Sequence, residues 1–362
     1  MQNIQNEFPI LTDCIYANTA ASGLMYRSLT EWRKQHSVDF LVGASEARAD
    51  GMQNYIPGAR KALATFLGCK VENVALVPNF SLGLNLLLEG LDKRSKILLL
   101  ENDYPSVNWP FEDRGFSIEY ARINARLEEN IWEKLESGNF SVLALSLVQW
   151  LNGIKIDLEF LKKVKEEYTD LIIIADGTQY CGTERFDFED SAIDILGASA
   201  YKWLLSGYGN GFLLFKDRVQ EYFSVKSIGF SAANANKEMR NSIRFAKHFE
   251  PGHLDTFNFG SLKFSLDFLN GIGIDNIAAQ NKRLSNKAKE TFTNLGLLNE
   301  DITERKDHST IFNIKGHDGL YNHLSKEKVI CAQRGDGIRL SFHFYNTEND
   351  IDKIAKILKK GI

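Results

Sequence analysis

The sequence has little cysteine and no long apolar run. Its four cysteines, Cys14, Cys69, Cys181 and Cys331, lie far apart and form no CxxC pair, which argues against a zinc site or a disulfide framework. The first residues show no charged start followed by an apolar core, and no apolar run approaches the ~20 residues needed to cross a bilayer. We therefore expect a cytoplasmic protein with reduced thiols, no metal and no membrane partner.

Neither sign of charge dominates the chain. The 362 residues include 43 Lys or Arg and 47 Asp or Glu, which gives a formal net charge of -4, and no basic patch or basic helix is evident. Binding to nucleic acid or to a membrane surface is therefore not indicated. We expect a small ligand.

Common catalytic motifs are missing as well. The sequence contains no GxSxG elbow, Walker A sequence or HExxH motif, which removes the commonest hydrolase, nucleotidase and zinc-protease functions. GYGNG at residues 207–211 contains GxGxG, but a strand-like run follows it where a dinucleotide site needs a helix. The segment is more typical of a turn.

Short, nearly continuous apolar runs alternate with helical patterns. The runs are typical of strands buried on both faces of a parallel sheet. They lie at residues 73–78, 96–101, 141–150, 171–176 and 211–215, and helical patterns lie at 82–91 and 158–168. This alternation predicts an α/β fold with a mainly parallel sheet.

The pattern changes after about residue 255. A long helix-like stretch at 262–295 precedes short strands and a final helix at 350–360. We predict a large domain at residues 19–254 and a smaller α+β domain formed by residues 1–18 and 255–362. No low-complexity linker separates them, so the two domains are expected to pack closely.

One lysine has unusual neighbours. Lys202 lies between Tyr201 and Trp203, and the apolar run at 211–215 follows shortly afterwards. Such a lysine either extends its ammonium group to water or uses its amine in chemistry. An apolar environment would lower the pKa of the amine toward the range in which it attacks an aldehyde.

Asp176 ends the run at 171–176, where open α/β sheets bind their ligands. A buried carboxylate needs a cationic partner, and the pyridinium nitrogen of pyridoxal phosphate (PLP) would be such a partner. Asn79, Phe80 and Ser81 lie between a strand run and a helical pattern, where a helix N-terminus favours a phosphate. An ordinary helix N-cap would use the same residues, so both interpretations stay open.

The ordered set of motifs resembles the class V aminotransferase superfamily. These motifs are YANTAASG at 16–23, ADGTQ at 175–179, SAYKW at 199–203, FEPGHLD at 249–255 and IRLSFHFYNT at 338–347. The resemblance spans almost the whole chain. It implies the fold of the PLP-dependent transferases of fold type I, PLP as cofactor, and a homodimer.

The resemblance also implies roles in the centre of the site. Lys202 would be the Schiff-base lysine, Asp176 the partner of the pyridinium nitrogen, and Gln179 a donor to the 3-oxygen of the ring. Tyr104 would stack on the ring, although a tyrosine in an ordinary loop would look the same in the sequence. Lys202, Asp176 and Tyr104 are the predicted catalytic residues. Gln149 or Asn152 would lie near the 3-oxygen.

Around the phosphate, the resemblance implies contacts from two chains. Ser199 would bind the phosphate together with Phe80 and Ser81, and Tyr201 would donate to it where desulfurases carry a histidine. His253 occupies a loop that usually reads Gly-Thr in the family and reaches the phosphate of the neighbouring subunit. A histidine in an ordinary surface loop is the alternative.

Arg339 resembles the family arginine that binds the α-carboxylate of the substrate, and its planar fork suits two parallel hydrogen bonds. Asn18 and Ala20 would line the substrate side. We therefore predict an amino-acid substrate.

Our leading prediction is an aminotransferase that acts at the α-carbon. A cysteine desulfurase or selenocysteine lyase, an amino-acid epimerase, kynureninase-like chemistry, and a non-catalytic binding protein on the same fold are the alternatives. Desulfuration needs a nucleophilic cysteine, and Cys331 lies in the strand-like run at 328–333, where an inert buried thiol is expected. The presence of both Lys202 and Asp176 argues against a non-catalytic protein.

Overall fold

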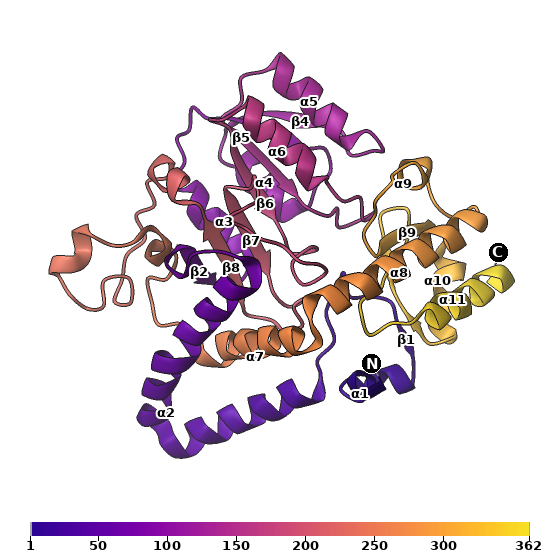
Figure 1. Cartoon of the computed structure of the whole chain (residues 1–362), viewed down its shortest axis with the longest axis horizontal. Helices are drawn as coiled ribbons and strands as arrows, with labels where there is room; N and C mark the ends of the chain where they lie inside the picture. Colours follow the sequence, from indigo (N-terminus) through magenta and orange to yellow (C-terminus); the bar gives the residue numbers. More distant parts are fainter. Residues whose placement is uncertain (1, 362) are drawn as a thin grey trace.

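The computed structural model describes residues 2–361, which form an α/β fold around a central sheet with a smaller α+β unit beside it (Figure 1). The strands are β1 Ile15–Tyr16, β2 Val74–Val77, β3 Lys96–Leu100, β4 Ser117–Ala121, β5 Val142–Ser146, β6 Ile172–Asp176, β7 Ile195–Ser199, β8 Gly211–Phe215, β9 Ile311–Lys315, β10 Val329–Ile330, β11 Ala332–Arg334 and β12 Gly337–Ser341. The α-helices are α1 Gln2–Gln5, α2 Arg27–Leu67, α3 Phe80–Leu88, α4 Pro105–Glu112, α5 Leu127–Ser137, α6 Leu158–Glu167, α7 Thr256–Ile272, α8 Ile274–Asn294, α9 Glu300–Thr303, α10 Asp318–Lys326 and α11 Glu348–Gly361. Short 3-10 helices are η1 Pro9–Thr12, η2 Val71–Asn73, η3 Asp217–Tyr222, η4 Glu238–Asn241 and η5 Phe245–Phe249.

The large sheet is mainly parallel, as predicted. Its seven strands follow the order β2-β8-β7-β6-β5-β3-β4. Only β8 runs against its neighbours, pairing antiparallel with both β2 and β7. The five strands β3 to β7 pair in parallel, so their carboxyl ends meet at one edge of the sheet.

Both faces of this sheet are covered, which explains the nearly continuous apolar runs in the sequence. In β6, Ile173 and Ala175 belong to an apolar cluster shared with α2, α5, α6 and α7. Ile172 and Ile174 belong to a second cluster, on the opposite face, shared with α3, α4 and η5. Each strand therefore buries successive residues on alternate faces.

The long helix α2 was not apparent from the sequence. It packs along α7, but it carries few buried residues over its length and contains Pro57. It also bends at Ala44, whose φ of 44° is not helical, and Figure 1 shows the helix turning sharply between two arms. Sparse burial gives a weak apolar periodicity, which is why no helical pattern was recognised.

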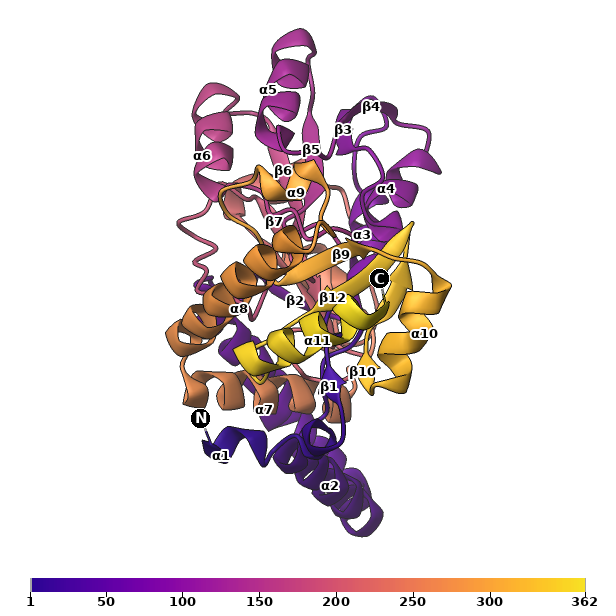
Figure 2. The same cartoon turned by 90° about the vertical axis from the view of Figure 1, so that its right-hand side faces the viewer.

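The smaller unit contains a three-stranded antiparallel sheet of order β11-β12-β9. Figure 2 shows α8, α10 and α11 beside this sheet. The apolar core of the unit joins residues of β9 and β12 to these three helices. Near the other end of the chain, β1 pairs in parallel with β10. The division into residues 19–254 and residues 1–18 with 255–362 stays a proposal.

Two local expectations need correction. The helix-like stretch at 262–295 is two helices, α7 and α8, because the chain turns at Gly273 with a φ of 89°, a conformation that favours glycine. Cys331 lies between the short strands β10 and β11, where we expected one continuous strand. Across residues 2–361, the structure contains no helix with the length and apolar character needed to cross a bilayer.

Candidate active site

The predicted catalytic residues meet at the carboxyl ends of adjacent parallel strands. Asp176 is the last residue of β6 and Ser199 is the last residue of β7, while Lys202 follows in the turn after β7. In the register of the sheet, Ser146 of β5 lies opposite Asp176. Tyr104 follows β3 and immediately precedes α4.

The Lys202 amine lies in an almost closed environment. The residue is 5% exposed, and its Nζ lies 5.6 Å from the ring centroid of Tyr104 and 5.5 Å from that of Tyr201. It forms no ion pair with any residue in the part of the chain that the structure describes. Burial lowers the pKa of Lys202 to about 8, although the nearby charge of Asp176 opposes this shift.

The turn that carries Lys202 is held by a close backbone approach. Gly23 donates its N–H to the carbonyl of Tyr201 at 3.0 Å, and a Cβ at Gly23 would lie only 2.0 Å from the carbonyl oxygen of Lys202. Any larger residue at position 23 would therefore displace the lysine. This contact accounts for the glycine of the YANTAASG motif.

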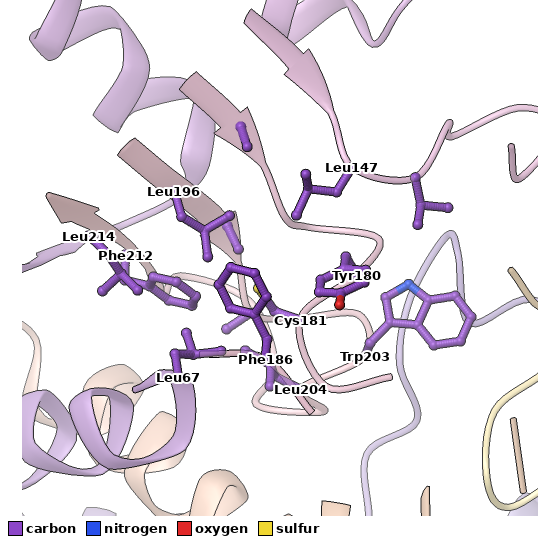
Figure 3. Packing of buried hydrophobic residues seen from close by; sticks show 14 of the residues in the cluster. Leu67, Leu147, Tyr180, Cys181, Phe186, Leu196, Trp203, Leu204, Phe212 and Leu214 are labelled. Atoms are coloured by element: carbon purple, nitrogen blue, oxygen red, sulfur yellow. The ribbon is translucent and has the colours of Figure 1, made fainter. Parts of the chain in front are cut away.

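Trp203 anchors the other side of the turn. Its indole Nε1 donates to Oε1 of Gln179 at 2.7 Å, and its carbonyl lies 3.1 Å from Nε2 of His343. Figure 3 shows Trp203 and Leu204 within the apolar cluster that also contains Leu147 and Tyr180. The packing of Trp203 and Leu204, together with the hydrogen bonds of Trp203, therefore fixes the turn that carries Lys202.

Asp176 is a buried carboxylate without a complete set of partners. Its Oδ1 accepts a hydrogen bond from the backbone N–H of Thr178 at 2.8 Å. Burial raises the pKa of Asp176 to about 6, while the Thr178 hydrogen bonds and the charge of Lys202 act in the opposite direction. A cationic ligand placed here would restore the stabilisation that water gives to an exposed carboxylate.

Sequence reasoning missed a second buried carboxylate, Asp103. It accepts hydrogen bonds from the backbone N–H of Ser146 at 2.8 Å, from the Ser146 hydroxyl at 2.6 Å and from the backbone N–H of Tyr104 at 2.6 Å. Burial raises its pKa, against these hydrogen bonds. Asp103 therefore ties the Tyr104 backbone to the end of β5. Its place just after a strand run was the signal that could have identified it.

The predicted phosphate residues are partly brought together. Asn79 caps α3, because its Oδ1 accepts from the N–H of Leu82 at 2.9 Å. The N–H of Phe80 donates to Oγ of Ser199 at 3.0 Å, so the start of α3 and the end of β7 are in contact. Ser81, in the first turn of α3, donates to Oγ of Ser106 at 2.7 Å. The ring of Tyr201 stacks on Tyr208, with centroids 4.4 Å apart.

Gln179 connects the site to the N-terminal segment. Its Nε2 donates to the carbonyl of Ala20 at 3.0 Å, and the N–H of Ala20 donates to Oγ of Ser341 at 2.9 Å. Gln149 is buried and its Nε2 lies 3.5 Å from the carbonyl of Ser146. Asn152 uses its Oδ1 to accept from Ile154 N–H at 3.1 Å, within a turn.

Arg339 reaches the site from the smaller unit. The residue is 3% exposed, and its Nη1 donates to the carbonyl of Trp150 at 2.7 Å. Burial lowers its pKa to about 10. Three buried polar atoms of this region have no hydrogen-bond partner among the described residues: Nε of Arg339, Nε1 of Trp150 and Oδ1 of Asn18.

His253 lies apart from the other predicted residues. It is exposed, its ring stacks on Phe230 with centroids 5.0 Å apart, and it lines a surface pocket of about 450 Å³ together with Arg48. The preceding Glu250 is buried and pairs with Arg60 and Lys247, each at 2.8 Å. No described contact joins His253 to Lys202 of the same chain.

Comparison with protein families gives one match, which covers most of the sequence. The profile of the family described as "Aminotransferase class-V" matches residues 43–354. An uncharacterized aminotransferase, YcbU, of Bacillus subtilis is 24% identical over 314 residues, which cover 82% of each chain. An isopenicillin N epimerase of Amycolatopsis lactamdurans is 23% identical over 336 residues, which cover 83% of this chain and 84% of that protein.

Solved structures share the fold at lower identity. The apo structure of a cysteine desulfurase from Thermococcus onnurineus NA1 has a TM-score of 0.86 at 18% identity and covers 99% of this chain and 97% of that chain. A mutant of C-DES, with glycine covalently linked to its PLP cofactor, has a TM-score of 0.87 at 17% identity and covers 98% of both chains. The predicted fold is therefore confirmed.

The environment of Lys202 generates a first prediction. In the cofactor-free protein, Lys202 should lose its proton near pH 8, far below the ordinary lysine value of 10.5, because burial disfavours the ammonium form. Exposed Lys70, whose pKa its partner Asp217 raises, serves as the control. Acylation by a small reagent across the alkaline range, measured by mass spectrometry and normalised to each residue's plateau, gives both curves. Coincident curves for the two lysines would contradict the inferred environment.

Proposed function

The chain belongs to the class V aminotransferase family, and from this premise we propose that it is a PLP-dependent aminotransferase acting at the α-carbon of an amino acid. The observation that carries the proposal is the placement of a buried amine just after β7 and a buried carboxylate at the end of the neighbouring strand β6. Family members use PLP, whose aldehyde, pyridine nitrogen and phosphate need an amine, an anion and an anion-binding site. Lys202, Asp176 and the start of α3 would supply these three.

The residues present fit this cofactor. The Lys202 amine makes no ion pair with any described residue, and Asp176 accepts a hydrogen bond only from Thr178 within residues 2–361. A polar ligand could also form hydrogen bonds with the unpartnered polar atoms of Asn18, Trp150 and Arg339, since buried polar groups are normally hydrogen-bonded. Together they make a buried site with several polar groups available to a ligand.

Each residue has a distinct role in this proposal. When bound, PLP supplies an electron sink that stabilises the charge left at the α-carbon after a proton departs. Lys202, with its lowered pKa, takes up and returns protons at that carbon near neutral pH. Asp176 keeps the ring nitrogen protonated through its negative charge. Tyr104, whose backbone N–H donates to Asp103, would offer its ring face to the cofactor, and Gln179 would donate its second amide hydrogen to the 3-oxygen.

The remaining residues would bind the phosphate of the cofactor and the carboxylate of the substrate. We assign Phe80, Ser81, Ser199 and Tyr201 to the phosphate. Arg339 binds the α-carboxylate of the substrate, while Asn18 and Ala20 line the substrate side. Gln149, which contacts Asp103 and the Ser146 carbonyl just after β5, would lie near the 3-oxygen of the ring.

Sulfur chemistry is the main competing function, and the position of Cys331 argues against it. Cys331 is buried in the core of the smaller unit together with Ile338 and Leu340. Arg339 lies between those two residues and points to the other face of the hairpin, because successive residues of a strand alternate. Burial raises the pKa of Cys331 to about 12, so the thiolate that would attack sulfur is not available.

An epimerase or a lyase would use the same residues in the same roles as an aminotransferase until the α-proton is lost. An amino-group transfer is distinguished from them by its product. Incubation with an amino acid alone should release one equivalent of 2-oxo acid for each active site, and the amino group should be recovered on an added 2-oxo acid. An epimerase would instead return the opposite enantiomer.

We further propose a homodimer in which His253 contacts the cofactor phosphate of the partner chain. Its exposure, and its position in a surface pocket that no other predicted site residue lines, support this assignment. The buried ion pairs of Glu250 with Arg60 and Lys247 fix the loop that would present the imidazole to the partner.

The covalent role of Lys202 gives a second prediction. Lys202→Ala should abolish covalent attachment of PLP and lower amino-transfer activity by roughly 100-fold or more, since a general acid and base is lost. Lys216→Ala removes another lysine whose pKa burial lowers, at the end of β8, and should leave both properties unchanged. Borohydride reduction followed by peptide mass spectrometry locates the attached cofactor. Attachment at a different lysine would refute the assignment.

Cys331 gives a third prediction. Cys331→Ala should keep the amino-transfer rate within about threefold of wild type, since the thiol lies in a core away from Arg339. Sulfide release from cysteine is measured in parallel. Release of sulfide by the wild type that disappears in Cys331→Ala would make desulfuration the function of this enzyme.

A shared site gives a fourth prediction. His253→Ala should weaken cofactor affinity by roughly ten- to a hundred-fold, the cost of one charge-assisted hydrogen bond. At a PLP concentration that saturates the wild type but leaves His253→Ala largely empty, heterodimers of Lys202→Ala and His253→Ala chains should recover up to half of the wild-type activity, because one of their two sites then contains neither lesion. Isolated heterodimers with no activity above that of the parent variants would place His253 outside the partner's site.

A further inference from the structure

A second arginine lies on the same hairpin face as Arg339. In the antiparallel pair of β11 and β12, Ala332 is opposite Arg339 and Arg334 is opposite Gly337. Residues 332 and 334 of one strand share a face, so Arg334 is the diagonal neighbour of Arg339, with Cα atoms about 7–8 Å apart in such a pair. Ile338 and Leu340 fill the opposite face, which belongs to the core of the smaller unit. Both arginines therefore leave the hairpin on the side of the large sheet.

The tip of this hairpin is fixed beside the active site. Asn313 of β9 donates through its Nδ2 to the carbonyl of Arg334 at 2.9 Å. Gly335, the next residue, has a φ of 54°, and a Cβ placed on it would lie 3.2 Å from the Leu151 side chain. Leu151 follows Trp150, whose carbonyl binds Arg339 and whose ring lies 6.0 Å from that of Tyr104. Arg334 thus starts from a fixed backbone at the edge of the site.

The Arg334 guanidinium has no anionic partner in the described part of the chain. Its one hydrogen bond is from Nη1 to the carbonyl of Gln333 at 2.9 Å, and the residue is exposed. Asp336, in the same turn, is also exposed and forms no ion pair with any described residue. The planar donor fork of Arg334 therefore remains available for a carboxylate.

Charge in this part of the site is positive. After burial, the charge of Arg334 is the next influence that lowers the pKa of Arg339. Arg339 and Arg334 also lower the pKa of Lys202, in addition to its burial and against the opposing charge of Asp176. The positive charge of Arg334 thus disfavours the charged form of Arg339, and an anion bound at each guanidinium group would reduce the repulsion between them. A substrate with one carboxylate would neutralise only one of them.

We propose that Arg334 binds a carboxylate on the side chain of the substrate, so that the enzyme selects acidic α-amino acids over neutral ones. This inference rests on the proposed function, in which Arg339 binds the α-carboxylate. The two guanidinium groups then bind the two ends of an α-amino dicarboxylic acid. Arg334 is a specificity residue, and it takes no part in proton transfer at the α-carbon.

A binding experiment tests this inference without requiring turnover. The PLP-supplied protein is titrated calorimetrically with glutarate, a dicarboxylate, and with butyrate, a monocarboxylate of similar length. Glutarate should bind roughly tenfold or more tightly than butyrate, and Arg334→Met should weaken glutarate binding by roughly ten- to a hundred-fold, the cost of a charge-assisted contact. Butyrate binding should stay within about threefold of wild type.

Arg126→Met is the matched control, because Arg126 is another exposed arginine, located before α5. It should leave both affinities unchanged. Equal binding of glutarate and butyrate by the wild type would overturn the inference. So would an equal loss of both affinities in Arg334→Met, since this result would show that both arginines bind the same carboxylate.

Turnover separates this inference from the proposed function. Wild type should release 2-oxo acid from glutamate or aspartate in preference to glutamine or asparagine, and Arg334→Met should remove the preference while its activity with the amides stays within about threefold. A dicarboxylate preference that depends on Arg334, with no amino transfer from any amino acid, would retain the anion site and refute the aminotransferase function. Amino transfer with no preference for acids would refute the specificity and retain the function.

Discussion

The central constraint on this structure is the burial of two ionisable groups, an amine and a carboxylate, at the ends of two neighbouring strands. Lys202 and Asp176 are 5% and 4% exposed, and neither forms an ion pair with a described residue. A charge in such a position is costly unless a partner is present. The opposite shifts of the two pKa values, to about 8 and to about 6, follow from the same loss of water. The fold holds both groups at the site in spite of this cost.

That position is maintained by segments far apart in the sequence. Near the start of the chain, Gly23 lies against the Lys202 backbone and Ala20 accepts a hydrogen bond from Gln179. Near the end of the chain, His343 lies within hydrogen-bonding distance of the Trp203 carbonyl. A glycine is required at position 23, since the carbonyl of Lys202 occupies the space of its side chain. The lysine turn therefore depends on the completed tertiary structure, and we expect the site to form late in folding.

The elements that could be predicted are those whose pattern is visible in a short stretch of the sequence. Strands such as β6 bury every residue, and this leaves a continuous apolar run that neighbouring residues alone reveal. The position of Asp176 followed from the end of that run. By contrast, α2 owes its stability to packing along α7, and its own pattern is weak. Asp103 has a local signal in its place after a strand run, but its role depends on hydrogen bonds to Ser146, which is distant in sequence and which that signal does not reveal. Positions set by long-range contacts leave little local signal.

The hairpin of β11 and β12 shows how a single register constrains the chemistry. Alternation along β12 places Ile338 and Leu340 in the core and turns Arg339 toward Trp150. Cys331 is adjacent to Ala332, the partner of Arg339, and so belongs to the core face. In the observed register, Cys331 and Arg339 therefore face opposite sides of the hairpin, because successive residues of a strand alternate. In this hairpin, binding of a substrate carboxylate and presentation of this cysteine exclude each other. A reaction that needed both would require a longer loop between the cysteine and the arginine.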